Sequence, residues 1–238
     1  MAHKKFELNE NQTVTIYKRR SSRNLRLTVA PDGQIRVSIP AWAPYRAGLE
    51  FAKKRQDWIS SQVRPRQDLM NGQAIGKAHR LRFIAADITV CRARIKSSEI
   101  VITHPSSLSS DSQEVQEIAR KACVRALRQQ AHLLLPQRLA TLAERYGFQY
   151  KSVIIKQLRS RWGSCDSHAN IVLNLYLMQL PWESIDYVLL HELTHTKILH
   201  HGPLFWGAME EVIPNVKQRR KAMLDFQPVL DSPLDPGL

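Results

Sequence analysis

A five-residue motif, HELTH at residues 191–195, constrains the chain more than any other feature. Residues four positions apart share one face of an α-helix, so His191 and His195 can point at a single metal ion. Glu192 lies beside them, where its carboxylate can take a proton from a water molecule held at the metal. The motif therefore predicts a hydrolytic metal site.

The residues before the motif predict that it lies on a buried helix. Pro181 suits a first helical turn, and Glu183 adds negative charge where a helix begins. Residues 188–190 and Leu193 are apolar on several sides of such a helix. Two histidines and a glutamate are costly at such a place unless they bind something. The alternative, two hydrogen-bonded core histidines without a metal, is the weaker interpretation.

A hydrolytic metal site needs a third protein ligand and an open position for water. The downstream candidates are His200, His201, Glu210 and Glu211. His201 follows His195 by six residues, the offset of the third histidine in the pattern HExxHxxGxxH. The glycine of that pattern is Ile198 here, so the chain must leave the helix by another route, near residues 197–199. We expect His201 to be the third ligand, and the other candidates remain alternatives.

An ordered series of motifs accompanies the histidines. It runs from KRRSSRNLRLTVAPDGQIRVSIP near the start through RWGSC, NIVLN and IDYVLLHELTH to His201 and Phe205-Trp206. The series resembles the YgjP-like metallopeptidases, over about Thr13 to Phe226. The resemblance implies a zincin-like catalytic domain, one zinc ion held by the three histidines, and a general base at Glu192. It also implies kinship with SprT/Spartan-type proteases, which act on proteins near DNA.

The segment before the motif helix is a candidate for substrate binding. Residues 151–158 and 170–178 read as two strands joined by the RWGSC loop. In zincins an edge strand beside the metal pairs with an extended peptide. The candidate substrate-binding residues are Arg161, Gly163, Ser164 and Tyr176. Gly163 would allow close approach of the backbone. Arg161, Tyr176 or His200 could stabilise an oxyanion. The alternative to substrate binding by the RWGSC segment is a tight structural loop packed by Trp162.

The remaining periodicity predicts an α+β chain: a zincin-like metallopeptidase domain with a β-rich N-terminal region. The expected strands are residues 13–18, 24–30, 34–40, 80–84, 87–92 and 99–103, with a turn at Pro31-Asp32-Gly33. The expected helices are residues 45–63 and 112–146, the second broken or kinked at Pro136 and ended by Gly147. We expect a β-rich region with one helix over residues 1–110 and the zincin-like catalytic domain, as one compact unit, over residues 111–238.

The chain is strongly basic. Its 35 Lys and Arg outnumber 21 Asp and Glu, a formal net charge of +14. Such an excess favours nucleic acid, an acidic protein or anionic lipid as a partner. Arg26, Thr28, Arg36 and Ser38 share one face of the predicted ribbon, and a basic cluster, Lys18, Arg19, Arg20 and Arg23, lies at the bend before it. This surface could bind a phosphate backbone. The alternative is a basic face that is merely solvated.

Composition predicts a cytoplasmic protein. The start of the chain has no apolar core of a secretory signal, and no run of about 18 apolar residues predicts a membrane span. Cys91, Cys123 and Cys165 are odd in number and widely separated, which favours reduced thiols over disulfides. The sequence does not predict the oligomeric state.

We therefore expect a zinc metallopeptidase that hydrolyses a protein or peptide, with nucleic acid as a second partner through the basic surface. Three alternatives remain. The same site could hydrolyse a phosphoanhydride such as a nucleoside triphosphate, since surplus Arg and Lys suit a polyphosphate. The protein could instead bind nucleic acid around a structural metal, although structural sites usually have four ligands. The third alternative is a metal-bound scaffold without turnover, against which the intact Glu192 weighs.

Overall fold

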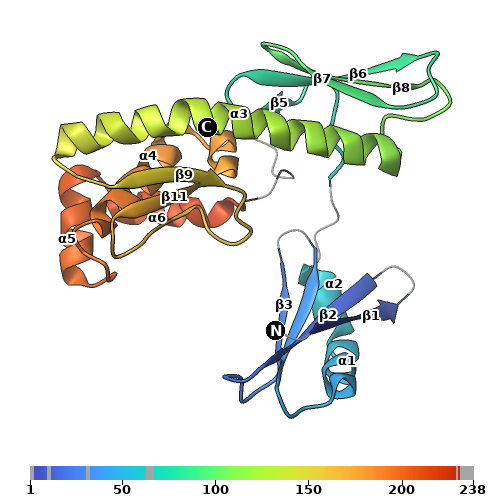
Figure 1. The fold of residues 1–238 in the computed structure, drawn as a ribbon, viewed down its shortest axis with the longest axis horizontal. Coiled ribbons are helices and arrows are strands. Elements are labelled where there is room, and N and C mark those ends of the chain that lie inside the picture. Colours follow the sequence, from blue (N-terminus) through green and yellow to red (C-terminus); the bar gives the residue numbers. More distant parts are fainter. Residues whose placement is uncertain (1–2, 10–11, 31–32, 63–66, 229, 231–238) are drawn as a thin grey trace. The chain divides into compact units, whose positions relative to one another are not determined.

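The structure is a computed structural model that describes residues 3–9, 12–30, 33–62, 67–228 and 230. The chain divides into two compact units, residues 1–66 and 67–238. Sheets come first along the chain and most helices follow, so the fold is α+β, as predicted (Figure 1). Among the described residues, no helix is both long and apolar enough to span a bilayer.

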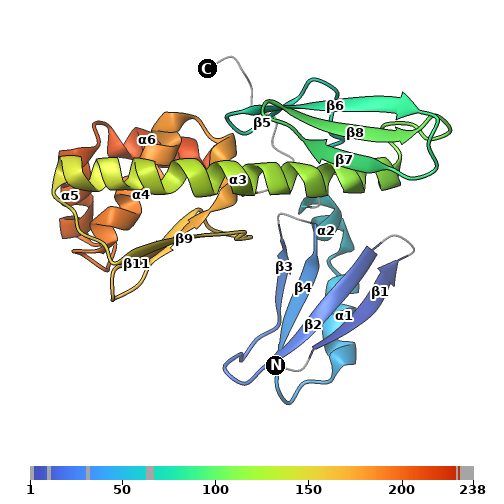
Figure 2. The ribbon, with the colours of Figure 1, turned by 45° about the horizontal axis from the view of Figure 1, so that its top comes forward.

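The first unit is a four-stranded sheet with two helices on one face (Figure 2). Its elements are β1 (His3–Asn9), β2 (Gln12–Arg19), β3 (Arg26–Val29), β4 (Ile35–Pro40), α1 (Tyr45–Lys53) and α2 (Gln56–Gln62). The strand order is β1-β2-β4-β3, with β2 and β4 parallel and the outer pairs antiparallel. Alternating residues Val14, Ile16, Val37 and Ile39 are fully buried against the helices.

Strands β2, β3 and β4 lie close to the predicted ranges, and β1 is an additional strand. The predicted helix over residues 45–63 is two helices in the structure, separated at Lys54 and Arg55. In the predicted turn, Gly33 has a φ of 76°. Pro31 and Asp32 lie outside the described residues, as does residue 63.

The second unit is organised around α3 (Gln113–Tyr146), a helix of 34 residues. A four-stranded sheet packs on its N-terminal half; its members are β5 (Ala74–Ile75), β6 (His79–Ala86), β7 (Arg92–Ile95) and β8 (Glu99–Pro105). Ile100 and Ile102 of β8 bury their side chains in one core with Ala119 and Ala126 of α3. The sheet order is β5-β6-β8-β7, and β7 begins where the predicted strand 87–92 ends.

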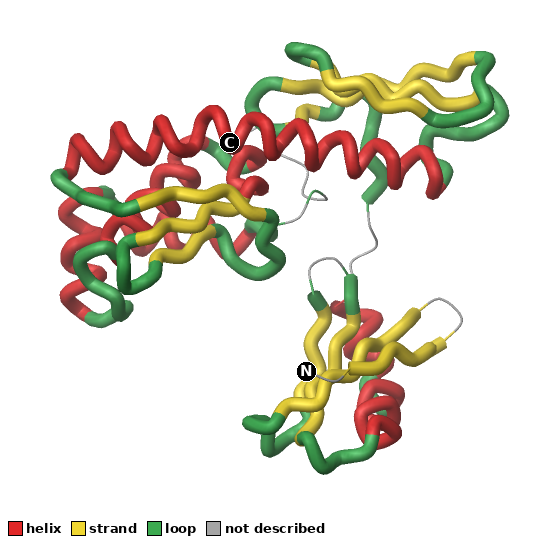
Figure 3. Tube along the Cα trace, viewed as in Figure 1, coloured by secondary structure: helices red, strands yellow, loops and turns green. Residues whose placement is uncertain are grey.

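The C-terminal half of α3 packs on a second layer, which carries the histidine motif (Figure 3). Its elements are β9 (Ser152–Lys156), β10 (Gly163–Cys165), β11 (Asn170–Asn174), the 3₁₀ helix η1 (Leu175–Gln179), α4 (Trp182–His195), α5 (Pro203–Val212), α6 (Val216–Ala222) and the 3₁₀ helix η2 (Met223–Asp225). The sheet order is β10-β11-β9, so β10 is an edge strand. The sequence predicts residues 163–165 as part of a loop, because three residues are too few to show an alternating pattern.

Helix α3 does not end at Pro136. It continues to Tyr146 and terminates at Gly147, whose φ of 66° suits glycine. Proline has no N–H to donate to the carbonyl four residues earlier, that of His132. Because His132 is exposed, water can bond that carbonyl, and packing of buried residues on both sides holds the helix together.

The division between the units differs from the expected boundary near residue 110. The strands β5 to β8 share a hydrophobic core with α3, to which Leu69, Ile75 and Leu81 contribute. Hydrogen bonds reinforce this packing: the Gln116 side chain bonds both the N–H and the carbonyl of Leu69, at 2.8 and 3.0 Å. The second core of the chain is confined to residues 8–59. A strand-rich composition does not reveal which core a strand joins.

Candidate metal centre

Helix α4 presents the two histidines of the motif from its last turn. His191 and His195 lie one turn apart, and their Nε2 atoms are 3.2 Å from each other. The flanking residues Leu189, Leu190 and Leu193 are at most 3% exposed. Because these side chains anchor the helix in the core, the two imidazoles are held in place before any ligand binds.

The chain after α4 brings His201 to the same point. The helix ends at His195, two residues before the expected exit, and the segment that follows is short and turned. The N–H of Gly202 donates to the carbonyl of His200 at 2.8 Å. The indole N–H of Trp206, on α5, donates to the carbonyl of His201 at 3.2 Å. These bonds fix the backbone on both sides of the His201 side chain.

The three Nε2 atoms form a nearly equilateral triangle. His201 Nε2 is 3.0 Å from both His191 Nε2 and His195 Nε2. Metal–nitrogen bonds of about 2.0–2.1 Å at tetrahedral angles put ligand nitrogens about 3.3 Å apart. These three are the one group of His, Cys, Asp and Glu in the described part of the chain whose ligand atoms cluster closely enough to hold a metal ion. The spacing fits a metal bound by three histidines.

The protonation of the histidines suits metal binding. Nδ1 of His195 is 3.0 Å from the carbonyl oxygen of Ile198, so Nδ1 carries the proton and donates it there. That tautomer leaves the Nε2 lone pair directed at the other two histidines. Burial lowers the pKa of His191 to about 3, helped by the neighbouring His195 and His201, and burial also lowers the pKa of His195. Both imidazoles are therefore neutral near pH 7, as metal ligands must be.

Two aromatic side chains pack against the three histidines. Phe205 of α5 is fully buried, and its ring centroid is 4.9, 4.5 and 4.8 Å from those of His191, His195 and His201. Trp206 stacks on His201 with ring centroids 5.9 Å apart. These ring contacts fix the orientation of the imidazoles.

Glu192 is buried beside the histidines and faces the edge strand β10. Its side chain is 5% exposed, and its Oε2 atom has no hydrogen-bond partner. Burial raises the pKa of its carboxyl to about 8, and the positive charge of Arg161 opposes this only in part. A Cβ atom at Gly163 would lie 2.7 Å from Glu192 Oε1, so glycine is what permits this approach. An isolated buried carboxyl fits a site whose missing partners are a cation and water.

The model of the YgjP-like metallopeptidase domain matches residues 23–225. This chain belongs to the YgjP-like metallopeptidase family. Membership makes it a peptidase-type hydrolase whose site takes a metal ion and whose substrate is a protein or peptide.

Among curated proteins, none matches this sequence significantly. Among solved structures, a crystal structure of the metallopeptidase zymogen of Pyrococcus abyssi abylysin is similar at 25% sequence identity, with a TM-score of 0.36; the match covers 39% of this chain and 95% of that one.

Within this YgjP-like domain, the predicted substrate-binding residues occupy different places. Arg161 is exposed and close enough to Glu192 to act on its charge. Gly163 and Ser164 lie on β10, opposite Leu173 and Val172 of β11. Tyr176 is 7% exposed in η1, and its hydroxyl accepts a hydrogen bond from Gln157 Nε2 at 2.8 Å. The edge strand β10 and Arg161 thus lie close to the Glu192 carboxyl, whereas the Tyr176 side chain is buried.

Asn174 also belongs to this site, although the sequence predicts it only as part of a strand. It is fully buried, and its Nδ2 donates to the carbonyls of Leu158 and Arg161 at 2.9 and 2.8 Å. Its Oδ1 accepts from the N–H of Tyr176 at 3.2 Å. Asn174 therefore fixes the segment that carries Arg161. The signal in the sequence is an asparagine that ends an apolar strand.

Other candidates lie apart from the triangle. The side chains of His200, Glu210 and Glu211 are exposed, and none joins the three-histidine group. Cys165, at the end of β10, is a free thiol, as are Cys91 and Cys123. Burial and the neighbouring Glu192 and Asp166 raise the pKa of the Cys165 thiol to about 11, so it stays protonated near neutral pH.

Arg220 of α6 is the residue that sequence reasoning missed altogether. Its guanidinium carbon lies 4.6 Å from the ring centroid of Trp206, and its charge contributes to lowering the pKa of His191. Arg220 stands 19 residues after His201, so only the packing of α6 against α4 brings it to the site. Two arginines therefore act on this site from separate segments: Arg161 from the loop before β10, and Arg220 from α6.

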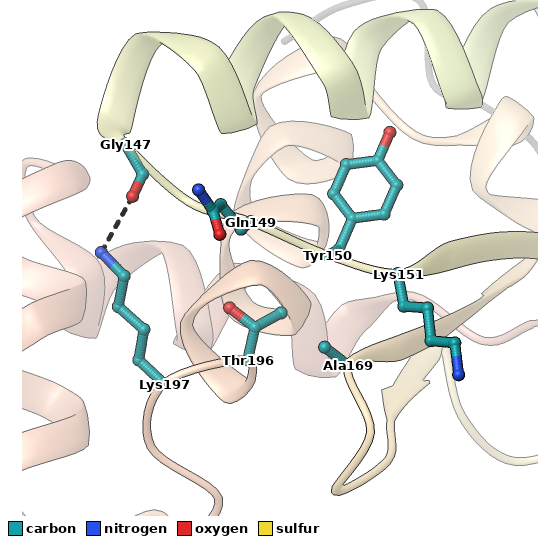
Figure 4. Close-up of a pocket in the computed structure, with 7 residues that line it drawn as sticks. All are labelled: Gly147, Gln149, Tyr150, Lys151, Ala169, Thr196 and Lys197. Carbon is teal, nitrogen blue, oxygen red and sulfur yellow. Dashed lines mark hydrogen bonds between the residues drawn. The ribbon is translucent and has the colours of Figure 1, made fainter.

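A hollow of about 510 Å³ lies beyond the end of α4, and it is separate from the candidate site residues (Figure 4). Its lining residues are Gly147, Gln149, Tyr150, Lys151, Ala169, Thr196 and Lys197. The ammonium of Lys197 donates to the carbonyl of Gly147 at 3.0 Å and lies over the Phe148 ring. These contacts tie the C-terminal end of α3 to the segment that follows His195.

Proposed function

We propose that the protein is a zinc-dependent peptidase in which His191, His195 and His201 hold one metal ion and Glu192 is the general base. The observation that carries this proposal is the triangle of Nε2 atoms, 3.0–3.2 Å apart, with a buried carboxyl beside it. Zinc is the metal that three neutral histidines with an open fourth position suit best. A bound zinc ion would polarise the scissile carbonyl and acidify a water molecule.

Glu192 supplies the proton transfers of the proposed reaction. Its carboxylate takes a proton from the attacking water and delivers it to the leaving amine nitrogen when the peptide bond breaks. A carboxyl with a pKa of about 8 is largely protonated at neutral pH. A nearby cation favours the charged form, so metal binding would prepare the base. Burial then keeps the carboxylate poorly solvated and reactive.

The edge strand β10 is the proposed binding site for the substrate backbone. In the three-stranded sheet it pairs on one side only, with β11. An extended peptide can add to such an edge through main-chain hydrogen bonds. We assign Gly163 and Ser164 to this contact. Arg161 is the best placed of the proposed oxyanion groups, because it is exposed and near Glu192, whereas the Tyr176 hydroxyl is already bonded to Gln157.

We further propose that the enzyme works in the cytoplasm, close to nucleic acid. The three free cysteines support a reducing compartment. The net charge of +14 supports a polyanionic neighbour. This part of the proposal concerns where the peptidase acts and leaves its chemistry unchanged.

One specific observation favours a second candidate function, hydrolysis of a nucleoside triphosphate. Arg161, in the loop before β10, acts electrostatically on Glu192, and Arg220, on α6, acts on His191. Guanidinium groups bind phosphate oxygens through paired hydrogen bonds. Peptide hydrolysis remains the preferred function because the family and the edge strand both favour it.

The test removes and restores the metal. Purified protein should contain about one zinc ion per chain. A chelator should abolish hydrolysis of casein, and zinc added back should restore it. The same preparations are assayed in parallel with nucleoside triphosphates. Zinc-dependent release of pyrophosphate or phosphate without casein cleavage would replace the peptidase proposal by the second candidate.

A further inference from the structure

The sheet of the first unit has one face that its helices do not cover. Residues of β2 and β4 that point to the helices form the core, whereas the intervening residues point to the other side. We call this other side the open face, and its charged and aromatic members are His3, Lys5, Tyr17, Arg19, Arg26 and Arg36. The register places them in rows, with His3 opposite Tyr17 and Arg26 opposite Ser38. Lys5 and Arg26 are exposed.

The open face is basic. In the described strands Glu7 is its one acidic member, and no ion pair among the described residues involves a cation of this face. The positive charge is concentrated in this part of the chain: residues 1–66 contain 14 Lys and Arg against 5 Asp and Glu. Such a surface attracts a phosphate backbone and loses the attraction as salt is added.

Aromatic rings lie among these cations. Tyr17 is on β2, one of the two inner strands, and its ring stacks on His3 with centroids 5.4 Å apart. Trp42 is 81% exposed just after Pro40, which lies opposite Arg19 at one end of the sheet. Aromatic rings surrounded by cations are the arrangement on which unpaired bases stack while the backbone is neutralised.

We propose that the open face binds single-stranded nucleic acid, with Tyr17 as the central stacking ring and Lys5, Arg26 and Arg36 as phosphate contacts. A duplex hides the faces of its bases, so the rings of the open face could not stack on them. The inference rests on the proposed action near nucleic acid and is independent of the peptidase mechanism. Its readout is binding, so its failure and the failure of the peptidase proposal are distinguishable.

The experiment uses the full-length protein and a labelled oligouridylate of about 12 nucleotides, followed by fluorescence anisotropy at several salt concentrations. Lys5→Ser/Arg26→Ser removes two phosphate contacts. Each phosphate contact to a single strand contributes about 0.7 to the salt slope, so the slope should flatten by about 1.4. Tyr17→Leu should weaken binding about tenfold, while Tyr17→Phe should bind nearly as wild type because it retains the ring.

The matched control is Lys53→Ser/Lys54→Ser, which removes the same charge from the same unit. Both lysines are exposed at the end of α1, on the helical side of the sheet. The affinity of this control for the oligouridylate should stay within about twofold of that of the wild-type protein at each salt concentration, since neither lysine contacts the nucleic acid in the proposed complex. An equal loss in both double variants would overturn the proposal, because only net charge would then matter.

Two other results would also overturn it. The first is binding of an RNA duplex of the same length as tightly as the single strand. The second is an unchanged affinity for the oligonucleotide in the open-face variants, together with a loss of binding to phosphatidylserine vesicles. That second result would assign the face to an anionic lipid surface instead. Circular dichroism of each variant verifies that the sheet is intact.

Discussion

At the scale of single residues, the grouping of His191, His195 and His201 could be predicted from the sequence. The four-residue spacing of His191 and His195 follows from helical periodicity, and His201 follows at the offset of a known pattern. Arg220 could not be predicted, because nothing in the local sequence says that α6 returns to the histidines. Periodicity reveals residues that share an element, whereas tertiary packing decides which elements meet.

Substitution of His200 and His201, one at a time, should show which of them is the metal ligand. His201→Ala should lose most of the bound metal, because His201 Nε2 completes the triangle at 3.0 Å from its neighbours. His200→Ala should keep it, because His200 is exposed and outside the group. Metal content by inductively coupled plasma mass spectrometry is the measurement. Loss of metal in His200→Ala with full metal in His201→Ala would contradict the assignment.

Gly163 should be intolerant of the smallest side chain. The added Cβ of Gly163→Ala would meet Glu192 Oε1 at 2.7 Å and Cγ at 2.8 Å, so Glu192 or β10 must shift. Because a displaced base loses its alignment, we expect about a 100-fold fall in kcat with metal content unchanged. Gly207→Ala is the control, since a Cβ at Gly207 meets nothing within 4 Å. Equal activity of the two variants would show that the approach of β10 to Glu192 is unimportant.

At the scale of elements, long helices and strongly alternating strands could be predicted, and short elements could not. Helix α3 lies within one residue of its expected range because its apolar pattern is long and Gly147 ends it. The three-residue β10 and the pairing of β9 with β11 in parallel have no signature in the sequence. Those two features position the proposed peptide-binding edge.

Asn174 links the strand β11 to the Arg161 segment, and its loss should affect both stability and activity. Asn174→Ala leaves the carbonyls of Leu158 and Arg161 and the N–H of Tyr176 without these bonds. We expect the free energy of unfolding to fall by about 2 kcal/mol or more, because buried polar groups become unsatisfied. Thermal unfolding measures this loss. Casein hydrolysis should fall as well, because Arg161 loses its support; wild-type stability and activity together would refute this role.

At the scale of the whole molecule, the sequence predicts a β-rich beginning and a catalytic end, and the two units divide at another place. The strands of residues 74–105 belong to the core of α3, so the catalytic unit is larger than the expected residues 111–238. All four residues proposed for catalysis and metal binding lie within residues 67–238. The first unit has a separate core and carries the open face.

The separate cores predict that the two proposed activities can be divided. A chain of residues 67–238 should fold, bind about one zinc ion and hydrolyse casein, because its core and its histidine triangle are complete. It should no longer bind the oligouridylate. A chain of residues 111–238 should fail to fold, since α3 would expose Ala119, Ala126 and their neighbours. Size-exclusion chromatography and thermal unfolding distinguish the two. Stable folding of the shorter chain would contradict the observed division.

The most direct test of the account is the variant Glu192→Gln, because it keeps the shape of the side chain and removes the base. Glu192 is not among the proposed ligands, so the variant should retain its zinc and a near-normal melting temperature. Hydrolysis of casein by the zinc-loaded variant should fall by about 100- to 10,000-fold, the usual contribution of a positioned base. Full activity in the zinc-loaded variant would contradict the proposed mechanism.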